Sequence, residues 1–291
     1  MIFKGSAVAL VTPFNDKNEI DFLALKELIE FQIVSGTKAL VILGTTGESA
    51  TITHEERNKI IQFCVSQINH RIPLIVGTGS NSTTIAVSYS KEAEKLGADG
   101  LLIVTPYYNK TSQEGIILHY KTISKSTKLP IIIYNVPSRT GVNISPTTIA
   151  KLSKIKNIVG LKDAGGNICQ SIEILHILPK TFALYSGDDL ITYPLMCLGY
   201  HGVISVTANA YPDLVSAMCE SVINRNQENA LRIHNLLYKI NTALFFDVNP
   251  ICIKFYMNLT DKKVGKPRLP LCLPSKEIQS KLMDIKELYE H

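Results

Sequence analysis

The sequence lacks tryptophan altogether, and it also lacks low-complexity segments and short repeats, which excludes collagen-like, fibrous and solenoid architectures. A helix that crosses a bilayer needs about 20 mostly apolar residues, and no run of that kind is present. The first apolar stretch, at 6–11, is shorter than the core of a secretory signal and is soon followed by Pro13. We therefore expect a strand there, and a cytoplasmic protein without a membrane partner.

Basic residues exceed acidic residues only slightly. Thirty Lys and Arg residues against 25 Asp and Glu residues give a net charge of +5. Basic side chains gather loosely at 151–156 and 262–268, but no aromatic residues are interleaved there for stacking on bases. We expect both clusters to be solvated surface and nucleic acid not to be a partner.

Motifs for metal binding are missing as well. The six cysteines are scattered without a C-x-x-C pair, and the seven histidines form no H-E-x-x-H motif. The nearest approach, His54-Glu55-Glu56-Arg57, has no second histidine. We expect no protein-bound metal.

What the sequence does contain is a series of short apolar, β-branched runs. They lie at 6–11, 39–43, 73–76, 100–104, 131–134, 158–161, 182–185 and 203–206. The runs do not alternate polar with apolar residues, which suits parallel strands covered on both faces. Eight such units predict a (β/α)8 barrel, the TIM-barrel fold, over residues 1–224. A doubly wound sheet is the alternative, but it needs a glycine-rich first turn, and Thr12-Pro13-Phe14 follows the first run instead.

Helix signals occupy the segments between the runs. Asp21 can cap one helix, Thr53 and Glu56 form a capping box for another, and Ser145-Pro146 combines an N-cap with proline at the first helical position. After about residue 225 the strand signal stops, and helices are expected at 230–246 and 275–289. We therefore predict a C-terminal helical domain at 225–291, packed on the barrel.

The carboxyl ends of the strands are where active sites of such barrels lie. Here those ends carry hydroxyl groups, one lysine and one arginine, without a histidine, a cysteine or a cluster of carboxylates. This set argues against Ser-His-Asp hydrolysis, metal-dependent hydrolysis and glycosidases with paired carboxylates.

Lys162 is the most informative of these residues, because it ends the apolar run at 158–161. Desolvation disfavours the charged form of a lysine, and a neutral amine can attack a ketone to form an imine. The alternative is a strand-end lysine that reaches water or pairs with Asp163. Lys254, in the apolar segment 251–256, is a weaker rival for the nucleophile because it lies outside the eight strands.

Several other residues at the strand ends have both a functional and an ordinary interpretation. Tyr134 and its fellow tyrosines at 107 and 108 can carry protons or fill the core. Thr45 and Thr46, between glycines, can hold a small carboxylate or form an ordinary turn. Arg139 can clamp a carboxylate or simply be exposed. The string at 77–82 suggests a dinucleotide loop, but it has Ser82 where a third glycine is needed.

Together these segments resemble the dihydrodipicolinate synthase family, within the pyruvate-dependent Schiff-base aldolases and lyases. The resemblance runs essentially end to end. It rests on GTTGESAT at 44–51, VTPYYNK at 104–110, YNVPSRTG at 134–141, GLKDA at 160–164, SGDD at 186–189 and HGVISVTAN at 201–209.

The resemblance implies a role for each matching residue. Lys162 would form the imine with pyruvate, and Tyr134 would act as acid and base, in a relay with Thr45 and with Tyr108 of a neighbouring subunit. Thr46 would hold the carboxylate of pyruvate. Arg139 would recognise the carboxylate of the second substrate, aspartate semialdehyde. Gly187 and Ile204 would contribute backbone contacts near the site.

The implied reaction joins pyruvate to aspartate semialdehyde in lysine and diaminopimelate biosynthesis and needs no cofactor. Family members are usually tetramers of two tight dimers, and we expect at least a dimer. A lyase for N-acetylneuraminate or another keto-sugar acid is the alternative within the family. Arg139 disfavours it because a polyol calls for neutral partners, and Thr45 disfavours it because sialate lyases usually carry serine there. A non-catalytic barrel that senses a small ligand is the alternative from another class.

The resemblance also suggests an allosteric lysine site between subunits, because Ala50, His54, Asn81 and Tyr107 match that pattern. Two positions depart from it: Arg57 replaces a common histidine, and Ile85 replaces the acid that would hold the amino group of lysine. Since an unpaired ammonium weakens binding, we expect weak or absent inhibition by lysine.

Overall fold

The computed structural model describes residues 1–290, in which eight parallel strands close into a barrel. Each strand pairs with the next, and β8 closes the ring on β1 with Ala7 opposite Ile204. The strands are β1 (Gly5–Ala9), β2 (Ala39–Ile42), β3 (Leu74–Gly77), β4 (Gly100–Val104), β5 (Ile131–Asn135), β6 (Ile158–Asp163), β7 (Ala183–Ser186) and β8 (Gly202–Ser205). The predicted (β/α)8 barrel is confirmed, and the doubly wound alternative is wrong.

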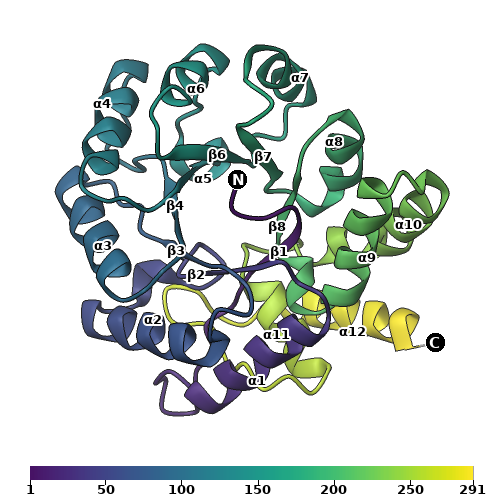
Figure 1. Ribbon diagram of the computed structural model, residues 1–291. Coiled ribbons are helices and arrows are strands. Elements are labelled where there is room, and N and C mark those ends of the chain that lie inside the picture. The colour runs from purple at the N-terminus through teal and green to yellow at the C-terminus, as the bar shows by residue number, and fades with distance from the viewer. Residues whose placement is uncertain (291) are drawn as a thin grey trace.

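Helices follow every strand, and all of them except the short α5, which lies beside the strands, form the outer ring seen in Figure 1. They are α1 (Phe22–Val34), α2 (His54–Ile68), α3 (Thr83–Lys95), α4 (Gln113–Ser124), α5 (Pro137–Thr140), α6 (Pro146–Leu152), α7 (Ile168–Ile177), α8 (Thr192–Leu198) and α9 (Pro212–Ile223). Short 3₁₀ turns lie at Ser49–Thr51, Asp189–Ile191 and Thr207–Asn209. These turns follow β2, β7 and β8, so they shape the end of the barrel where the candidate site residues gather.

Apolar side chains fill both sides of the sheet, which explains why the strand sequences show no alternation. One layer lies inside the barrel and includes Ala7, Val41, Ile75, Leu102 and Ile132. A second layer lies between the sheet and the helices and includes Val8, Leu40, Val76, Leu101 and Ile133. The ring of Phe3 stacks on Tyr185, with centroids 4.2 Å apart, and the Phe3 carbonyl accepts a hydrogen bond from the Tyr185 hydroxyl at 2.7 Å. This pair fills the amino end of the barrel.

The expected helix caps are present. The Asp21 carboxylate accepts the hydrogen bond of an N–H in the first turn of α1. Thr53 and Glu56 exchange the two reciprocal bonds of a capping box at the start of α2. Ser145 caps α6, with Pro146 as its first residue. These local signals fix where the outer helices begin, and hence the length of the loops before them.

The C-terminal extension contains α10 (Gln227–Ala243), α11 (Ile251–Leu259) and α12 (Lys276–Glu290). Helix α10 packs along α9, and α12 packs on α10 and α11. Figure 1 shows α10 and α12 outside the ring, on the side of α9, whereas α11 overlaps α1 in this view. The expected helices at 230–246 and 275–289 are present, whereas α11 lies where none was expected. The expected boundary falls between α9 and α10, and the division into two domains stays a prediction.

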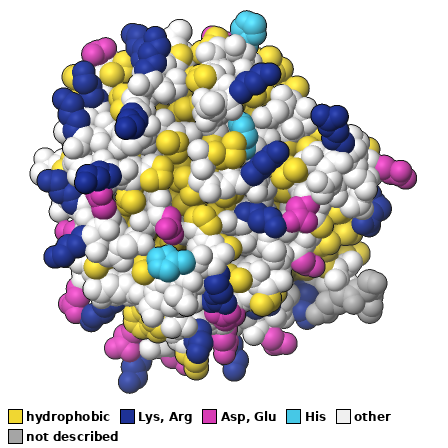
Figure 2. All heavy atoms as spheres, in the orientation of Figure 1, with side chains coloured by type: hydrophobic (Ala, Val, Ile, Leu, Met, Phe, Trp, Pro, Cys, Tyr) yellow, Lys and Arg dark blue, Asp and Glu magenta, His cyan; other side chains and the backbone are white. Residues whose placement is uncertain are grey.

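Basic side chains on the surface are dispersed among acidic ones on the face shown in Figure 2. The cluster at 151–156 is exposed at Lys151, Lys154 and Lys156, as expected. The expectation for the second cluster is wrong at Arg268, whose side chain is only 11% exposed and lies 2.6 Å from the Glu56 carboxylate. Among residues 1–290, no helix has both the length and the apolar character needed to traverse a bilayer.

Candidate active site

Lys162 lies near the carboxyl end of β6, between Tyr134 on β5 and Tyr185 on β7 in the sheet register. It is only 5% exposed, and its Nζ lies 4.4 Å from the centre of the Tyr134 ring. An amine and a phenol are therefore held side by side with little water around them. Formation of an imine, with proton transfer beside it, needs such a pair.

Asp163, the next residue, points to the opposite face of the strand. Its carboxylate accepts hydrogen bonds from the hydroxyls of Ser171 and Tyr200, each at 2.8 Å, and from the N–H of Gly165 at 3.0 Å. Burial raises the pKa of Tyr200, as does the nearby carboxylate, so its hydroxyl stays a donor. None of the ion pairs within residues 1–290 joins Asp163 to Lys162. The carboxylate instead holds the end of β6 in place.

A cavity of about 330 Å³ adjoins Lys162. The loops after β2, β5, β6 and β7 contribute to its wall, as does the segment before α11. The wall includes Thr46, Tyr134, Arg139, Lys162, Gly187 and Asn249. All but Asn249 are candidates from the sequence, so the fold brings five of them to one space.

Gly187, in the loop after β7, leaves room for the lysine side chain. A β-carbon at this position would stand 3.0 Å from Cε of Lys162 and 2.8 Å from the β-carbon of Ala164. The N–H of Gly187 donates to the carbonyl of Asp163 at 2.7 Å, which ties the loop to β6. A side chain at this position would therefore crowd Ala164 and Lys162 together.

Thr45 and Thr46 lie in a tight turn after β2. Gly47, in this turn, is packed closely: a β-carbon there would stand 3.1 Å from the backbone just after β1 and just after β2. The hydroxyl of Thr12 donates to the Gly47 carbonyl at 2.7 Å. Thr46 is buried, and Thr45 shares a small cavity of about 40 Å³ with Tyr134. The turn therefore brings one threonine to the tyrosine and the other to the larger cavity.

Asn249 connects Thr46 to Arg139. Its side-chain amide donates to the Thr46 hydroxyl at 3.0 Å, and its backbone carbonyl accepts a hydrogen bond from the Arg139 guanidinium at 2.9 Å. Its side-chain oxygen is buried and has no hydrogen-bond partner among residues 1–290. Sequence reasoning missed Asn249, because an Asn-Pro pair by itself indicates only a turn.

Two candidate residues lie apart from this cavity within one chain. Tyr108 is 91% exposed in the loop after β4, with a left-handed backbone (φ 70°). Ile204 lies on β8 with its side chain in the layer of residues inside the barrel. The structure thus brings Thr45 to Tyr134 without bringing Tyr108 to either of them.

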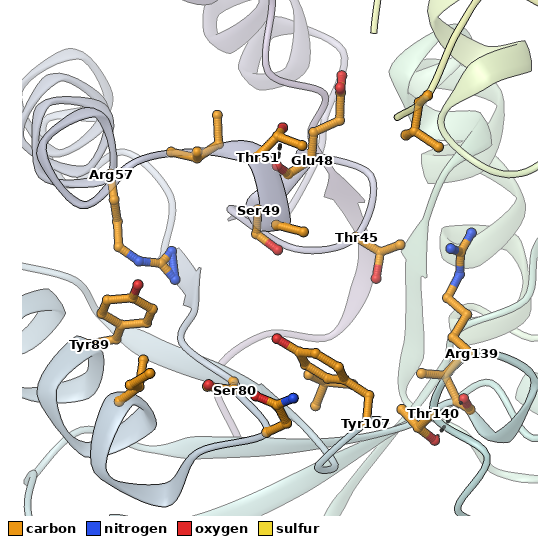
Figure 3. Close-up of a pocket in the computed structure, with 18 of the residues that line it drawn as sticks. Thr45, Glu48, Ser49, Thr51, Arg57, Ser80, Tyr89, Tyr107, Arg139 and Thr140 are labelled. Atoms are coloured by element: carbon orange, nitrogen blue, oxygen red, sulfur yellow. Dashed lines mark hydrogen bonds between the residues drawn. The ribbon is translucent and has the colours of Figure 1, made fainter. Parts of the chain in front are cut away.

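A second cavity, of about 540 Å³, lies beside the first and is shown in Figure 3. Ala50, Asn81 and Tyr107 line it, as do Arg139 and Asn249, which also line the first cavity. His54, the remaining candidate for an allosteric site, instead lies with its Nε2 3.6 Å from Glu92.

Arg57 and Ile85, the two residues that depart from the expected lysine pattern, both line this second cavity. The Arg57 guanidinium lies over the ring of Tyr89, 4.2 Å from its centre, and donates to the carbonyl of Gly77 at 2.6 Å (Figure 3). Burial lowers the pKa of Arg57 to about 10, so the group remains a cation at neutral pH. The cavity thus contains a buried positive charge.

Within residues 1–290, no group of three or more His, Cys, Asp or Glu side chains could hold a metal ion. The polar groups in the wall of the first cavity include the Lys162 amine, the Tyr134 phenol, the hydroxyls of Thr46 and Ser138, the Arg139 guanidinium and the Asp188 carboxyl group.

Comparison with known proteins agrees with this geometry. The model of the dihydrodipicolinate synthetase family matches residues 2–288. The chain belongs to that family. The family resemblance seen in the sequence is thereby confirmed.

Relatives within the family are similar over nearly their whole length. A 4-hydroxy-tetrahydrodipicolinate synthase of Alkaliphilus oremlandii is 49% identical over 284 residues, covering 97% of each chain. One of Geotalea daltonii is 46% identical over 289 residues, covering 99% of each. The crystal structure of dihydrodipicolinate synthase from Aquifex aeolicus superposes with a TM-score of 0.97 at 42% identity, covering 99% of this chain and 98% of that one. A dihydrodipicolinate synthase described as the first monomeric variant superposes with a TM-score of 0.96 at 40% identity, covering 98% and 96%.

Proposed function

We propose that this chain is a 4-hydroxy-tetrahydrodipicolinate synthase, which condenses pyruvate with L-aspartate 4-semialdehyde. The observation that carries the proposal is the buried amine of Lys162, held 4.4 Å from the Tyr134 ring in a cavity that Arg139 also lines. Relatives that cover nearly the whole chain have that activity in their names. Hydroxyls and a guanidinium suit two substrates that each carry a carboxylate.

The reaction begins when the amine of Lys162, after giving up a proton, attacks the keto carbon of pyruvate and water leaves, giving an imine. The protonated imine draws electrons from the neighbouring methyl group, which loses a proton to Tyr134 and becomes an enamine. The enamine carbon attacks the aldehyde of the second substrate, whose oxygen takes up a proton. The amine of that substrate then attacks the imine carbon, closes the ring and displaces Lys162. One water leaves overall, and no external oxidant or cofactor is needed.

Proton transfer in this scheme falls to Tyr134 and its neighbours. Thr45 faces the same small cavity as Tyr134, so its hydroxyl can pass a proton to or from the phenol. Tyr108 would complete the relay from a second subunit, because its side chain points into solvent within one chain. We therefore propose at least a dimer, and a tetramer of two tight dimers as the full assembly.

Recognition of the two carboxylates falls to Thr46 and Arg139. Thr46 would bind the carboxylate of pyruvate near Lys162, and Arg139 would bind that of the semialdehyde closer to the opening. Asn249 holds both side chains, so it would set the distance between the two carboxylates. The guanidinium also argues against a keto-sugar acid as partner, because a neutral polyol gains little from a fixed cation.

The experiment that tests the proposal is reduction with borohydride in the presence of pyruvate, followed by peptide mapping. A stable adduct on Lys162 is expected, and Lys162→Ala should abolish both the adduct and the condensation. Lys156→Ala, at an exposed lysine, should retain both. An unmodified Lys162 would overturn the mechanism. Cleavage of N-acetylneuraminate at a rate exceeding the condensation would overturn the choice of substrate.

A further inference from the structure

Glu48 and Lys254 form an ion pair that is buried almost completely, outside the cavity of Lys162. The side chains are 1% and 0% exposed, and Nζ of Lys254 lies 2.8 Å from Oε1 of Glu48. Taking two charges out of water is costly, and replacing such a pair by apolar side chains is often neutral or stabilising. The pair therefore calls for an explanation other than stability alone.

Every hydrogen of the Lys254 ammonium has a partner. Besides Glu48, it donates to the carbonyls of Thr12 at 3.0 Å and Lys266 at 3.1 Å, and it lies 4.2 Å from the centre of the Phe14 ring. Burial lowers the pKa of Lys254 to about 8, against the opposing attraction of Glu48. An ammonium held in this way is a structural donor, so Lys254 is not a rival nucleophile to Lys162.

The carboxylate of Glu48 is satisfied on its other side as well. Its Oε2 accepts a hydrogen bond from the backbone N–H of Arg268 at 2.8 Å. Figure 3 shows this carboxylate pointing away from the second cavity, while Thr45 points into it. The Glu48 side chain thus anchors the turn to the C-terminal extension, while neighbouring side chains of the turn face the cavities.

The backbone of Glu48 explains why an anchor is useful at this position. Glu48 is in the left-handed region, with φ 55° and ψ 36°, which costs energy for a residue with a side chain. Its N–H donates to the carbonyl of Thr45 at 3.1 Å, and its carbonyl accepts from Thr51. This strained residue closes the turn, two positions after Thr46. The direction of the threonine side chains therefore depends on Glu48 keeping this conformation.

We propose that the Glu48–Lys254 ion pair is a positioning device, by which α11 holds the Thr45–Thr46 turn in the geometry needed to bind the carboxylate of the first substrate. This inference rests on the proposed function. In this proposal, neither of the two paired side chains touches the substrate. The pair joins the end of β1, the turn after β2, α11 and the segment at 264–268, so the extension becomes part of the active-site support.

The test compares the double variant Glu48→Gln/Lys254→Met with the wild type. Both charges disappear with little change in volume, so the fold should be retained, as measured by circular dichroism and thermal unfolding. We expect KM for pyruvate to rise, and kcat/KM for pyruvate to fall roughly 10- to 100-fold, as for a misplaced binding group. The exposed pair provides the matched control: Glu55→Gln/Lys59→Met should behave as the wild type.

A second background separates positioning from a general loss of stability. In Thr46→Val, the turn no longer has the hydroxyl that the ion pair would place. Adding the Glu48 and Lys254 changes to Thr46→Val should therefore lower kcat/KM for pyruvate much less than the same changes lower it in the wild type. Additive effects, or wild-type KM and kcat in a folded double variant, would overturn the proposal.

If the double variant does not fold, Glu48→Gln alone is used, because it keeps an acceptor for Lys254, and a KM for pyruvate within twofold of the wild type would then overturn the proposal. The proposed function is judged separately, from condensation and the borohydride adduct in the wild type. If the wild type shows neither condensation nor the adduct, the proposed function is refuted. The positioning role is tested separately, by the ratio of pyruvate affinity in the variant to that in the wild type.

Discussion

Asn249 donates its side-chain amide to the hydroxyl of Thr46, a residue 203 positions earlier in the chain. The bond joins the loop before α11 to the turn after β2, and the Asn249 carbonyl holds Arg139 as well. A residue of the extension thus links the two groups that we propose for the two carboxylates. The catalytic end of the barrel is therefore incomplete without the segment after α10.

This relationship predicts that Asn249→Ala impairs the binding of both substrates. The hydroxyl of Thr46 and the guanidinium lose a fixed neighbour, so KM should rise for pyruvate and for aspartate semialdehyde, and kcat/KM should fall roughly 10- to 100-fold. Steady-state kinetics with each substrate varied in turn would measure this. Asn235→Ala, at an exposed position on α10, is the control and should be unchanged. An effect on one substrate alone would contradict the bridging role.

Gly187→Ala should damage the lysine directly. The added β-carbon would stand 2.8 Å from the β-carbon of Ala164 and 3.0 Å from Cε of Lys162, so we expect the lysine side chain to shift. We expect kcat/KM to fall about 10²-fold, with a slower borohydride adduct, while the thermal midpoint changes by only a few degrees. Normal trapping by pyruvate in a folded variant would show that Lys162 has more room than the structure indicates.

Tyr108 provides a test of assembly as well as of catalysis. Tyr108→Phe should lower kcat about 10²- to 10⁴-fold, the usual contribution of a placed acid or base. If the tyrosine acts in a neighbouring subunit, mixing and reassembling Tyr108→Phe with Lys162→Ala should restore part of the activity. Some mixed sites would then combine an intact lysine with an intact tyrosine. Sedimentation would report the assembly, and activity in a strictly monomeric fraction would refute the shared site.

Lysine should inhibit this enzyme weakly or not at all. Ile85 supplies no carboxylate for the ammonium of lysine, and the buried cation of Arg57 lies in the same cavity. Binding of a second cation there is disfavoured because the two like charges repel each other. Activity measured against increasing lysine would test this, and half-inhibition at sub-millimolar lysine would contradict it.

The ion pair of Glu56 and Arg268 predicts an acid-sensitive contribution to stability. The hydrogen bond from Arg268 lowers the pKa of Glu56 from 4.5 to about 2. A carboxyl with a lowered pKa in the folded chain stabilises the fold fully above pH 4.5, and this contribution is lost as the pH falls toward 2. By linkage it amounts to at most about 3 kcal/mol.

Glu56→Gln should therefore lower the free energy of unfolding at neutral pH and flatten its decline between pH 4.5 and 2. Urea unfolding at a series of pH values would measure both effects. Glu55→Gln, at the neighbouring exposed carboxylate, should change little because surface pairs contribute little. An unchanged pH profile in Glu56→Gln would mean that the pair does not stabilise the fold.

The barrel and the lysine could be predicted because their signals are local. Eight apolar runs mark eight strands, and Lys162 stands at the end of one of them. The supporting contacts could not be predicted, since they join residues far apart in sequence. Arg268 belongs to a basic cluster in the sequence, yet it binds Glu56, 212 positions earlier. Likewise, nothing near Asn249 or Lys254 in the chain indicates Thr46 or Glu48 as a partner.

The stacked rings of Phe3 and Tyr185 lie at the amino end of the barrel, whereas the cavity of Lys162 lies among the loops at the carboxyl ends of the strands. The small keto acid would then reach the buried amine before the larger aldehyde enters the same cavity. Product leaves by the same route only after the ring has closed and the amine is free again. We therefore expect an ordered addition, in which the first reactant to arrive is the one whose attachment to the enzyme is broken last.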